Sequence, residues 1–501
     1  MKYICRAAPQ GPLLNFTVMH GRQLFGWIGL MLLTGWNARG QVRVPRLVGD
    51  GMVLQREIPI RIWGFGSPGE RVTVKFDGET ASAVTDDNGK WLAIFSPKKA
   101  GGPYTMDIDG INHIWLKNIM VGEVWFCAGG SGMQETMETV KEKYADLIAR
   151  ADRAPIRQYH IGTRYDFKGP RQNLSSGGWE TASPTSVLSF SALAYLFAAQ
   201  LYDHYHVPIG LIDATVADAP AEAWLSPDAL PSFPVFAAMA DRYGDSSYAE
   251  GTGPADRMAT GGIFNGMIAP AATYTVRGVL WCQGEANIGK PAEYRGTFAT
   301  LIGDWRRHWG QTSLPWVYVQ SGAHGAPAQQ PEESRWAELR EAQRLVLSVP
   351  MTGMAVSADL GEENGGDLPN KEELAKRLFL AAEGAAYEKA NIIYTGPIFH
   401  SVRIRHNKVS IRFDEVESGL IVKGGGELHG FALAGADNHF YWAKAVIEGK
   451  KVVVTCDQVA NPVVVRYGWA DNPAGANLYN RDQLFQDGLP APPFEARKLA
   501  R

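Results

Sequence analysis

The chain lacks several features that mark particular classes of protein. Its formal net charge is only -3, with 20% charged residues, so the sequence predicts neither a basic surface for nucleic acid nor an acidic tail. It has four cysteines, and the three beyond residue 40 are widely spaced, which is no disulfide framework. No Cys or His spacing predicts a metal site, and no motif predicts a cofactor. These absences favour a partner that is neutral or small.

Long apolar runs are also missing, apart from one short run near the start of the chain. Residues 24–33 are mostly apolar, and Ala38-Arg-Gly40 behind them offers small residues where a signal peptidase reads. The run is too short for a membrane span, although an uncleaved anchor is the alternative. Residues 1–40 therefore resemble a secretory signal peptide, for which Met19 is a more ordinary start. We expect an exported protein, periplasmic or secreted, that begins near Gln41 and is not held at the membrane; its oligomeric state is not predicted.

The 501 residues are enough for two to four domains. Short alternating segments broken by turn signals predict an antiparallel β-sandwich over residues 42–117. Apolar strands alternate with helical stretches over 118–391, which predicts a parallel α/β sheet with helices on both faces. Strand patterns return in 392–485, where we expect a second β domain, and residues 486–501 form a tail. The helices expected in the α/β part span 191–205, 294–308, 335–347 and 371–389.

A glycine-rich turn follows an apolar stretch in the segment Gly122-Glu-Val-Trp-Phe-Cys-Ala-Gly-Gly-Ser131-Gly-Met133. The apolar residues predict a buried strand, and the glycines permit a turn that is too tight for larger side chains. Such a turn presents a hydroxyl at the carboxyl edge of the sheet, where α/β proteins bind their ligands. Ser131 is therefore a candidate nucleophile. The alternative is that Ser131 only caps the helix that follows.

Polar side chains also gather after a second predicted strand. The segment Trp281-Cys-Gln-Gly-Glu-Ala-Asn287 places Gln283, Glu285 and Asn287 in one short loop. Polar groups at the end of a buried strand are costly unless they hold a ligand, the backbone or each other. We interpret this loop as part of a binding site. A structural network of hydrogen bonds that fixes the loop is the alternative.

In this order, the segments resemble those of the sialate O-acetylesterase-like carbohydrate esterases, a family of the SGNH hydrolase superfamily. The family's first segment reads approximately Gly-Glu-Val-Trp-Cys-Ser-Gly-Gln-Ser-Asn-Met, which implies that Ser131 is the nucleophile. Its Trp-Tyr-Gln-Gly-Glu-Ser-Asn resembles residues 281–287 and implies that Asn287 lies in the oxyanion hole. The similarity runs from residue 50 to residue 479. It implies an SGNH-hydrolase-like α/β domain between two β domains, and an acetylated carbohydrate as substrate.

The chain departs from the family in two segments. The family reads Trp-Gly-Gly-Thr-Pro-Ala-Glu-Ala-Trp where this chain reads Val216-Ala-Asp-Ala-Pro-Ala-Glu-Ala-Trp224. The glycine that the family uses in the oxyanion hole thus becomes Ala217 or Asp218. A carboxylate at this place would repel the charge that develops on the tetrahedral intermediate.

The second departure concerns the catalytic acid and base. The family carries them in a segment like Asn-Asp-Ile-His-Pro-Lys-Asn-Lys, whereas the chain reads Gly-Gly-Asp-Leu-Pro-Asn-Lys up to Lys371. Asp367 takes the place of either the histidine or the aspartate, and no imidazole is supplied in either alignment. His324, in a loop after a predicted strand, is a candidate for a substitute base. Loss of one triad member typically lowers turnover by about four to six powers of ten.

Three interpretations follow from these observations. The first is an exported esterase that removes acetyl groups from sialic acid or polysaccharide through Ser131. The second is a pseudoenzyme that binds acetylated glycan without turnover, with Gln283, Glu285, Asp218 and Trp224 as substrate contacts in either case. In the third, the β domains are the functional part, and exposed aromatics such as Tyr441 and Trp442 are its only support.

Overall fold

Residues 40–501 form one compact unit of the chain. In the computed structural model the described residues are 41–232, 259–361, 370–389, 392–481 and 488–498. The predicted signal segment and Asp367 lie outside these ranges. Within the described ranges, no helix has both the length and the apolar character that a membrane crossing requires.

A parallel sheet forms the centre of the α/β part. Its strand order is β13-β12-β11-β7-β10-β8-β9, with every neighbouring pair parallel except β8 and β9. Strand β7 lies in the middle of this sheet, between β10 and β11, and its second half is buried on both faces. The bounds are β7 His113–Gly129, β8 Ile156–His160, β9 Trp179–Thr181, β10 Ile209–Thr215, β11 Gly278–Cys282, β12 Trp316–Val319 and β13 Thr352–Ala355.

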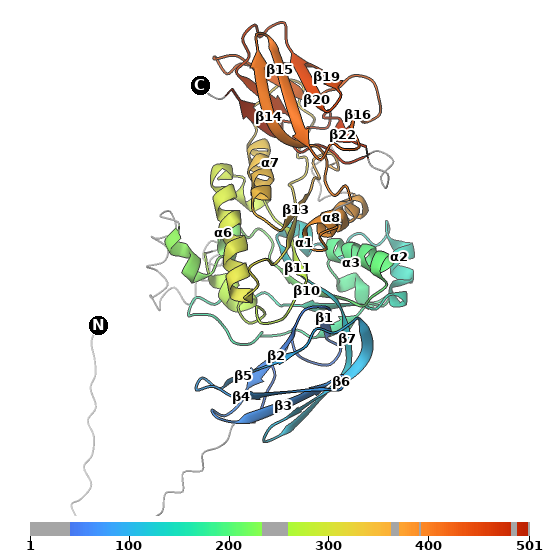
Figure 1. Cartoon of the computed structure of the whole chain (residues 1–501), viewed down its shortest axis with the longest axis vertical. Coiled ribbons are helices and arrows are strands. Elements are labelled where there is room, and N and C mark those ends of the chain that lie inside the picture. Colours follow the sequence, from blue (N-terminus) through green and yellow to red (C-terminus); the bar gives the residue numbers. More distant parts are fainter. Residues whose placement is uncertain (1–40, 233–258, 362–369, 390–391, 482–487, 499–501) are drawn as a thin grey trace, which may run out of the picture. The chain divides into compact units, whose positions relative to one another are not determined.

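Helices cover both faces of this sheet, as predicted (Figure 1). Side chains of a strand alternate between its faces, so Trp125 packs edge-on against Phe197 while Phe126 packs against Trp305 on the opposite side. The first face carries α3 (Ala192–Tyr205) and α8 (Lys371–Ala385), and the second carries α6 (Pro291–Trp309) and α7 (Arg335–Leu345). The parallel α/β prediction is confirmed, although α8 ends four residues before the predicted limit of 389.

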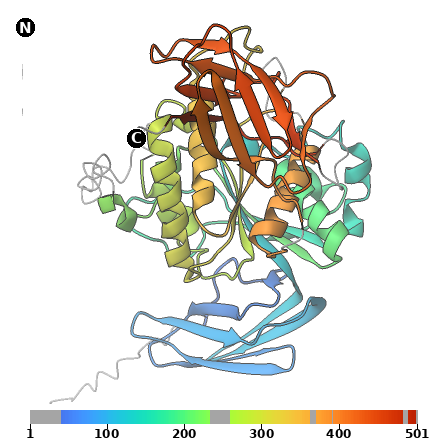
Figure 2. The ribbon, with the colours of Figure 1, turned by 45° about the horizontal axis from the view of Figure 1, so that its top comes forward.

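Most of the N-terminal strands form antiparallel pairs, whereas β1 pairs in parallel with β7. Strands β3 and β6 pair with each other and β6 pairs with the first half of β7, while β2 and β5 form a separate pair (Figure 2). Strand β7 then continues without a break into the parallel sheet, so the predicted boundary at residue 117 falls inside one strand. The bounds are β1 Val53–Gln55, β2 Ile60–Phe65, β3 Arg71–Phe76, β4 Glu79–Val84, β5 Lys90–Phe95 and β6 Gly101–Asp109.

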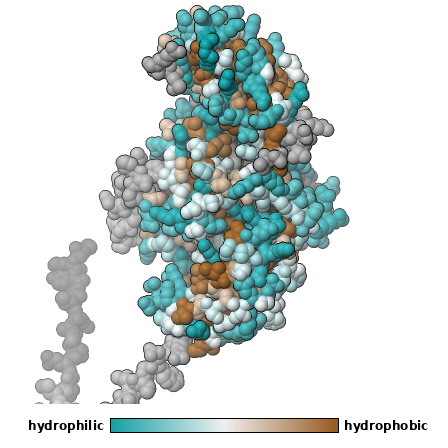
Figure 3. Space-filling model, in the orientation of Figure 1, coloured by the Kyte–Doolittle hydropathy of each residue, from teal (hydrophilic) through white to brown (hydrophobic). Residues whose placement is uncertain are grey.

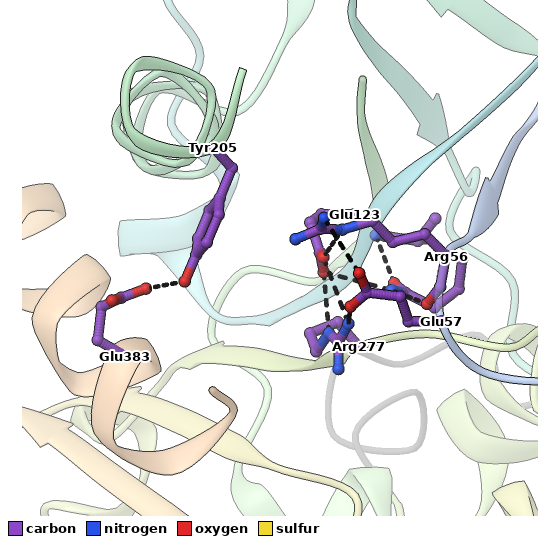
Figure 4. A network of polar contacts seen from close by, with 8 residues as sticks. Arg56, Glu57, Glu123, Tyr205, Arg277 and Glu383 are labelled. Carbon is purple, nitrogen blue, oxygen red and sulfur yellow. Dashed lines mark hydrogen bonds and ion pairs between the residues drawn. The ribbon is translucent and has the colours of Figure 1, made fainter. Parts of the chain in front are cut away.

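Figure 4 shows an ion-pair network around Glu123. The network lies at the amino end of the parallel sheet, whereas Ser131 lies at the carboxyl end. The Glu123 side chain is fully buried and contacts both the Arg56 and the Arg277 guanidinium groups, with 2.9 Å from Arg277 Nε to Glu123 Oε2. Glu57 is exposed and contacts the same two arginines at 3.5 and 3.6 Å. The network joins β1, β7 and β11 at the start of the sheet.

The C-terminal part consists of antiparallel strands around their own core. One sheet has the order β14-β15-β20-β19 and a second has the order β18-β17-β21-β23, with β16 and β22 as a further pair. Figure 3 shows one face of the whole molecule, and this face is mostly hydrophilic with small hydrophobic patches. The bounds are β14 Ile398–Arg405, β15 Lys408–Asp414, β16 Leu420–Val422, β17 Phe431–Ala434, β18 Phe440–Trp442, β19 Lys444–Glu448, β20 Lys451–Thr455, β21 Val464–Tyr467, β22 Leu478–Asn480 and β23 Phe494–Arg497.

Candidate active site

A tight turn joins β7 to the residues that follow it. The Gly130 N–H donates a hydrogen bond to the Cys282 carbonyl (2.8 Å), and the Val216 N–H donates to the Gly129 carbonyl (3.0 Å). These bonds tie the turn to the ends of both neighbouring strands. Gly129 has φ of 136°, and a Cβ there would lie 2.0 Å from the Cys282 carbonyl oxygen. Only glycine fits, so the sequence pattern has a steric cause.

Ser131 is the first residue of the short helix α1 (Ser131–Gln134), and its N-cap position is occupied by Gly130. Its half-buried hydroxyl makes no hydrogen bond to any described residue, and neither does its backbone N–H. A hydrogen bond of 2.6 Å from the Ser191 hydroxyl to the Met133 carbonyl holds helix α1 in place. Ser131 is thus not a side-chain cap. A candidate nucleophile and a candidate oxyanion donor, the Ser131 hydroxyl and N–H, thus lie together at the carboxyl edge of the sheet.

Asn287 lies in the loop after β11, which is the strand next to β7. Its Oδ1 accepts hydrogen bonds from the Ala221 N–H (2.8 Å) and from Gln283 Nε2 (2.7 Å), and its Nδ2 donates to Glu222 Oε2 (2.8 Å). The side chain is 5% exposed. The amide is therefore held firmly between two loops, with one Nδ2 hydrogen free of these bonds.

Gln283 is buried and fully engaged within the protein. Its Nε2 also donates to the Ala219 carbonyl (3.2 Å), and its Oε1 accepts from the Tyr294 hydroxyl (2.9 Å). Burial raises the pKa of Tyr294 above its ordinary value, so this hydroxyl remains a proton donor at neutral pH. In this arrangement Gln283 positions Asn287, which is the loop-fixing alternative of the sequence analysis.

The other three residues expected to contact substrate differ in their surroundings. Trp224 is completely buried in an aromatic cluster with Trp281 and Trp305. Glu285 is exposed beside Asn287 in the same loop. Asp218 is exposed and has φ of 56°, the left-handed conformation that glycine adopts most easily. The loop that carries glycine in the family thus keeps a glycine-like backbone conformation at Asp218.

The residues around the predicted acid and base segment are partly described. Asp367 lies outside the described residues. Beyond it, buried Lys371 forms an ion pair with Glu135 (Nζ to Oε2, 2.5 Å), one turn after Ser131. The start of α8 is therefore anchored beside the residues that follow helix α1, which Ser131 begins.

Asp359, at the other side of that segment, is already paired. Its carboxylate accepts two hydrogen bonds from the Arg377 guanidinium, at 2.6 and 2.8 Å, and one from the Tyr479 hydroxyl at 2.8 Å. Burial acts to raise the pKa of Asp359, but these partners hold it below its ordinary value. A carboxylate stabilised in its charged form is a weak base, so Asp359 does not replace the histidine.

His324 follows β12, in a loop with its backbone N–H bonded to the Asp471 carbonyl at 3.0 Å. Its exposed ring stacks on Trp336 with a centroid distance of 4.9 Å. The structure gives no contact between His324 and Ser131.

A histidine and aspartate pair that the sequence analysis missed lies on the other side of β7. His160 ends β8, and its Nδ1 is 2.8 Å from Oδ2 of Asp213 in β10. The Asp213 carboxylate raises the pKa of His160, since it stabilises the charged imidazolium. The two residues are 53 positions apart in the sequence. Only the pairing of β8 with β10 brings them together, and no local motif marks either one.

A parallel α/β sheet with helices on both faces, a serine on a glycine turn at its carboxyl edge and a fixed asparagine in the next loop define a serine hydrolase fold of the SGNH type. Comparison with known families agrees. The family model described as carbohydrate esterase, sialic acid-specific acetylesterase matches residues 121–378. The chain belongs to this family of carbohydrate esterases.

Individual relatives align over nearly the whole chain. Sialate O-acetylesterase of Homo sapiens is 28% identical over 500 residues, covering 91% of this chain and 92% of the relative. The mouse protein of that name is 27% identical, covering 91% and 94%. A crystal structure of a carbohydrate acetylesterase from Xanthomonas citri matches with a TM-score of 0.81 and 34% identity, covering 92% of this chain and all of that one.

Proposed function

We propose that the protein is an exported carbohydrate O-acetylesterase that hydrolyses acetyl esters on sialic acid or on a polysaccharide. The observation that carries the proposal is the open Ser131 at the carboxyl end of β7, with its hydroxyl and its backbone N–H both unbonded to the described residues. Family membership supports the same chemistry. Asn287 in the neighbouring loop supplies the second donor.

In the proposed reaction the Ser131 oxygen attacks the acetyl carbonyl carbon and forms a bond to it. The carbonyl oxygen becomes an oxyanion that accepts hydrogen bonds from the Ser131 N–H and from Asn287 Nδ2. The bond between the carbonyl carbon and the sugar oxygen then breaks, and the sugar leaves as an alcohol with the proton that the Ser131 hydroxyl gave up. Water attacks the acetyl-serine in turn, which releases acetate and returns a proton to the Ser131 oxygen. Asp367 is the proposed proton acceptor. A carboxylate has an ordinary pKa of about 4, so we expect slow turnover compared with a histidine-containing triad.

A second candidate function is binding of an acetylated glycan without turnover. It is favoured by one observation, the absence of any histidine from residues 359–371 of the sequence. The esterase remains the main proposal, because the glycine turn, the start of α1 at Ser131 and the hydrogen bonds of Asn287 are all present.

An assay of the purified mature protein with p-nitrophenyl acetate and an acetylated oligosaccharide distinguishes the two candidate functions. We expect Ser131→Ala to abolish turnover of both, while the matched variant Ser348→Ala, at an exposed serine, keeps wild-type rates. Equal rates for wild type and Ser131→Ala would reject the esterase. If the wild-type protein then bound the oligosaccharide without hydrolysing it, the second function would be supported.

Export is proposed from the resemblance of residues 1–40 to a signal peptide. We expect the extracytoplasmic protein from a native host to begin near Gln41, which N-terminal sequencing measures. A cytoplasmic protein with an intact N-terminus would contradict export without affecting the esterase proposal.

A further inference from the structure

A polar depression of about 570 Å³ lies at the carboxyl ends of β8 and β10. Its lining includes Gln134, Gln158, His160, Glu180, Asp213 and Thr215. The volume is within the range of small-molecule sites, which is roughly 300 to 1,000 Å³. None of the residues discussed above as nucleophile or oxyanion donor belongs to this lining, so the depression is separate from the reacting atoms.

Two residues of the lining carry buried polar atoms that make no hydrogen bond to the described residues. Asp213 is 4% exposed and uses one carboxylate oxygen for His160, while its Oδ1 is buried without a hydrogen-bond partner among the described residues. The hydroxyl of Thr215, which is 1% exposed, is unpartnered in the same way. Buried polar groups normally have partners, so two adjacent unpaired groups point to a ligand that supplies hydrogen bonds.

The chemistry of the lining restricts that ligand. Carboxylates accept hydrogen bonds, amides both donate and accept, and the remaining lining is mainly serine, threonine and glycine. Among the lining residues that the structure describes there is no lysine or arginine, which are the usual partners of a carboxylate or phosphate. Two acidic side chains, Asp213 and Glu180, would repel an anion. The surface therefore suits an uncharged molecule with many hydroxyl groups.

The depression adjoins the nucleophile turn. Thr215 pairs with Gly129, two residues before Ser131, and Gln134 is the last residue of the helix that Ser131 begins. A ligand seated between Gln134 and Asp213 would thus lie beside the ester that Ser131 attacks. We infer that this depression is a subsite for an uncharged sugar unit of the acetylated substrate, with Asp213 and His160 as its central contacts; this inference rests on the proposed esterase function.

The test separates sugar binding from the reaction itself. Initial rates are measured on an acetylated neutral oligosaccharide and on p-nitrophenyl acetate, which carries no sugar. For Asp213→Asn, Glu180→Gln and Gln134→Ala we expect KM for the oligosaccharide to rise about tenfold relative to KM for p-nitrophenyl acetate. Glu138→Gln, at an exposed glutamate that is outside the lining, is the matched control and should leave the ratio unchanged.

Two outcomes would overturn the inference: an unchanged KM ratio in all three variants, or a parallel loss on both substrates, which would indicate a structural role. Because Asp213 is buried and Asp213→Asn can impair folding, the exposed positions Glu180 and Gln134 keep the test decisive.

If wild type turns over neither substrate, the esterase proposal fails and the subsite is tested by calorimetry. Deacetylated oligosaccharide should then bind the wild-type protein and should bind Glu180→Gln about tenfold more weakly. Equal affinity for both proteins would reject the subsite.

Discussion

Asn287 and Glu222 are joined by a hydrogen bond of 2.8 Å from the amide Nδ2 to the carboxylate Oε2. On the other side of the amide, Oδ1 receives two donors, the Ala221 N–H and Gln283 Nε2. Two donors on one end and one acceptor on the other fix which end is nitrogen. The remaining Nδ2 hydrogen is thus available in a fixed orientation, as an oxyanion hole requires.

Replacement of Asn287 by alanine should remove this donor and loosen the loop that carries it. Loss of one oxyanion donor typically lowers kcat by about 100- to 1,000-fold. We expect Asn287→Ala to reduce kcat on p-nitrophenyl acetate by that order, with a smaller change in KM. Asn88→Ala, at an exposed turn residue, is the matched control. A kcat within twofold of wild type would contradict the proposed role.

Glu123→Gln should destabilise the fold without touching the site. The buried carboxylate compensates two guanidinium groups, and removal of its charge leaves Arg56 and Arg277 without a buried counterion. Breaking a buried pair costs about 3–5 kcal/mol of unfolding free energy. Glu57→Gln removes an exposed partner of the same arginines and should cost about 1 kcal/mol or less. Urea unfolding of the two variants measures the difference, and equal losses would show that burial of Glu123 is unimportant.

The His160 and Asp213 pair should make stability depend on pH. The folded-state pKa of His160 is raised by Asp213, so the contribution of the pair is complete below the ordinary histidine pKa of about 6.5 and disappears as pH rises through the raised value. We expect Asp213→Asn to lower the pKa of His160 in an NMR titration. Its stability deficit should be greater at pH 5.5 than at pH 9. A deficit that is independent of pH would show that the pair is not ionic.

The ion pair of Asp359 with Arg377 should make the free energy of unfolding depend on pH in the opposite direction. The folded-state pKa of Asp359 lies below the ordinary value, so its contribution is complete above about pH 4 and disappears as pH falls through the lowered value. Asp359→Asn should therefore destabilise the protein at pH 7 by about 3 kcal/mol or more, because Arg377 loses its buried partner, and by less at pH 2.5. Asp228→Asn, at an exposed aspartate, is the control in unfolding experiments at both pH values. An equal deficit for Asp359→Asn at both pH values would contradict the ionic account.

The local sequence pattern predicted the secondary structure well where a segment showed a single clear pattern, such as an apolar run or a helical period. The apolar run up to Gly129 became the end of β7, and the predicted helix at 335–347 is α7 with only its last residues in a different helical form. The continuity of β7 through residue 117 was not predicted, because alternation and a buried run look like two separate strands. The His160 and Asp213 pair could not be predicted, since it depends on the register between β8 and β10.

In the candidate site, too, some features could be predicted from local sequence and others depend on contacts between distant residues. Ser131 could be predicted as a candidate because the turn before it requires glycine at position 129, and this requirement is visible in the sequence. Gln283 was expected to contact substrate, but its amide is committed to Ala219, Asn287 and Tyr294. Polar residues that bind a ligand and polar residues that bind a loop are alike in sequence, and only the positions of their partners distinguish them.

Asp218 offers a test of the oxyanion loop. It holds φ of 56°, a conformation that costs a residue other than glycine about 1 kcal/mol or more. Its carboxylate also brings a negative charge to the loop that we propose to lie beside the developing oxyanion. Asp218→Gly removes both disadvantages, so we expect higher stability and a several-fold rise in kcat on p-nitrophenyl acetate. Asp77→Gly makes the same replacement at φ of 46° in the N-terminal strands and should raise stability alone. If both variants changed kcat equally, or neither did, the Asp218 carboxylate would have no electrostatic effect on the reaction.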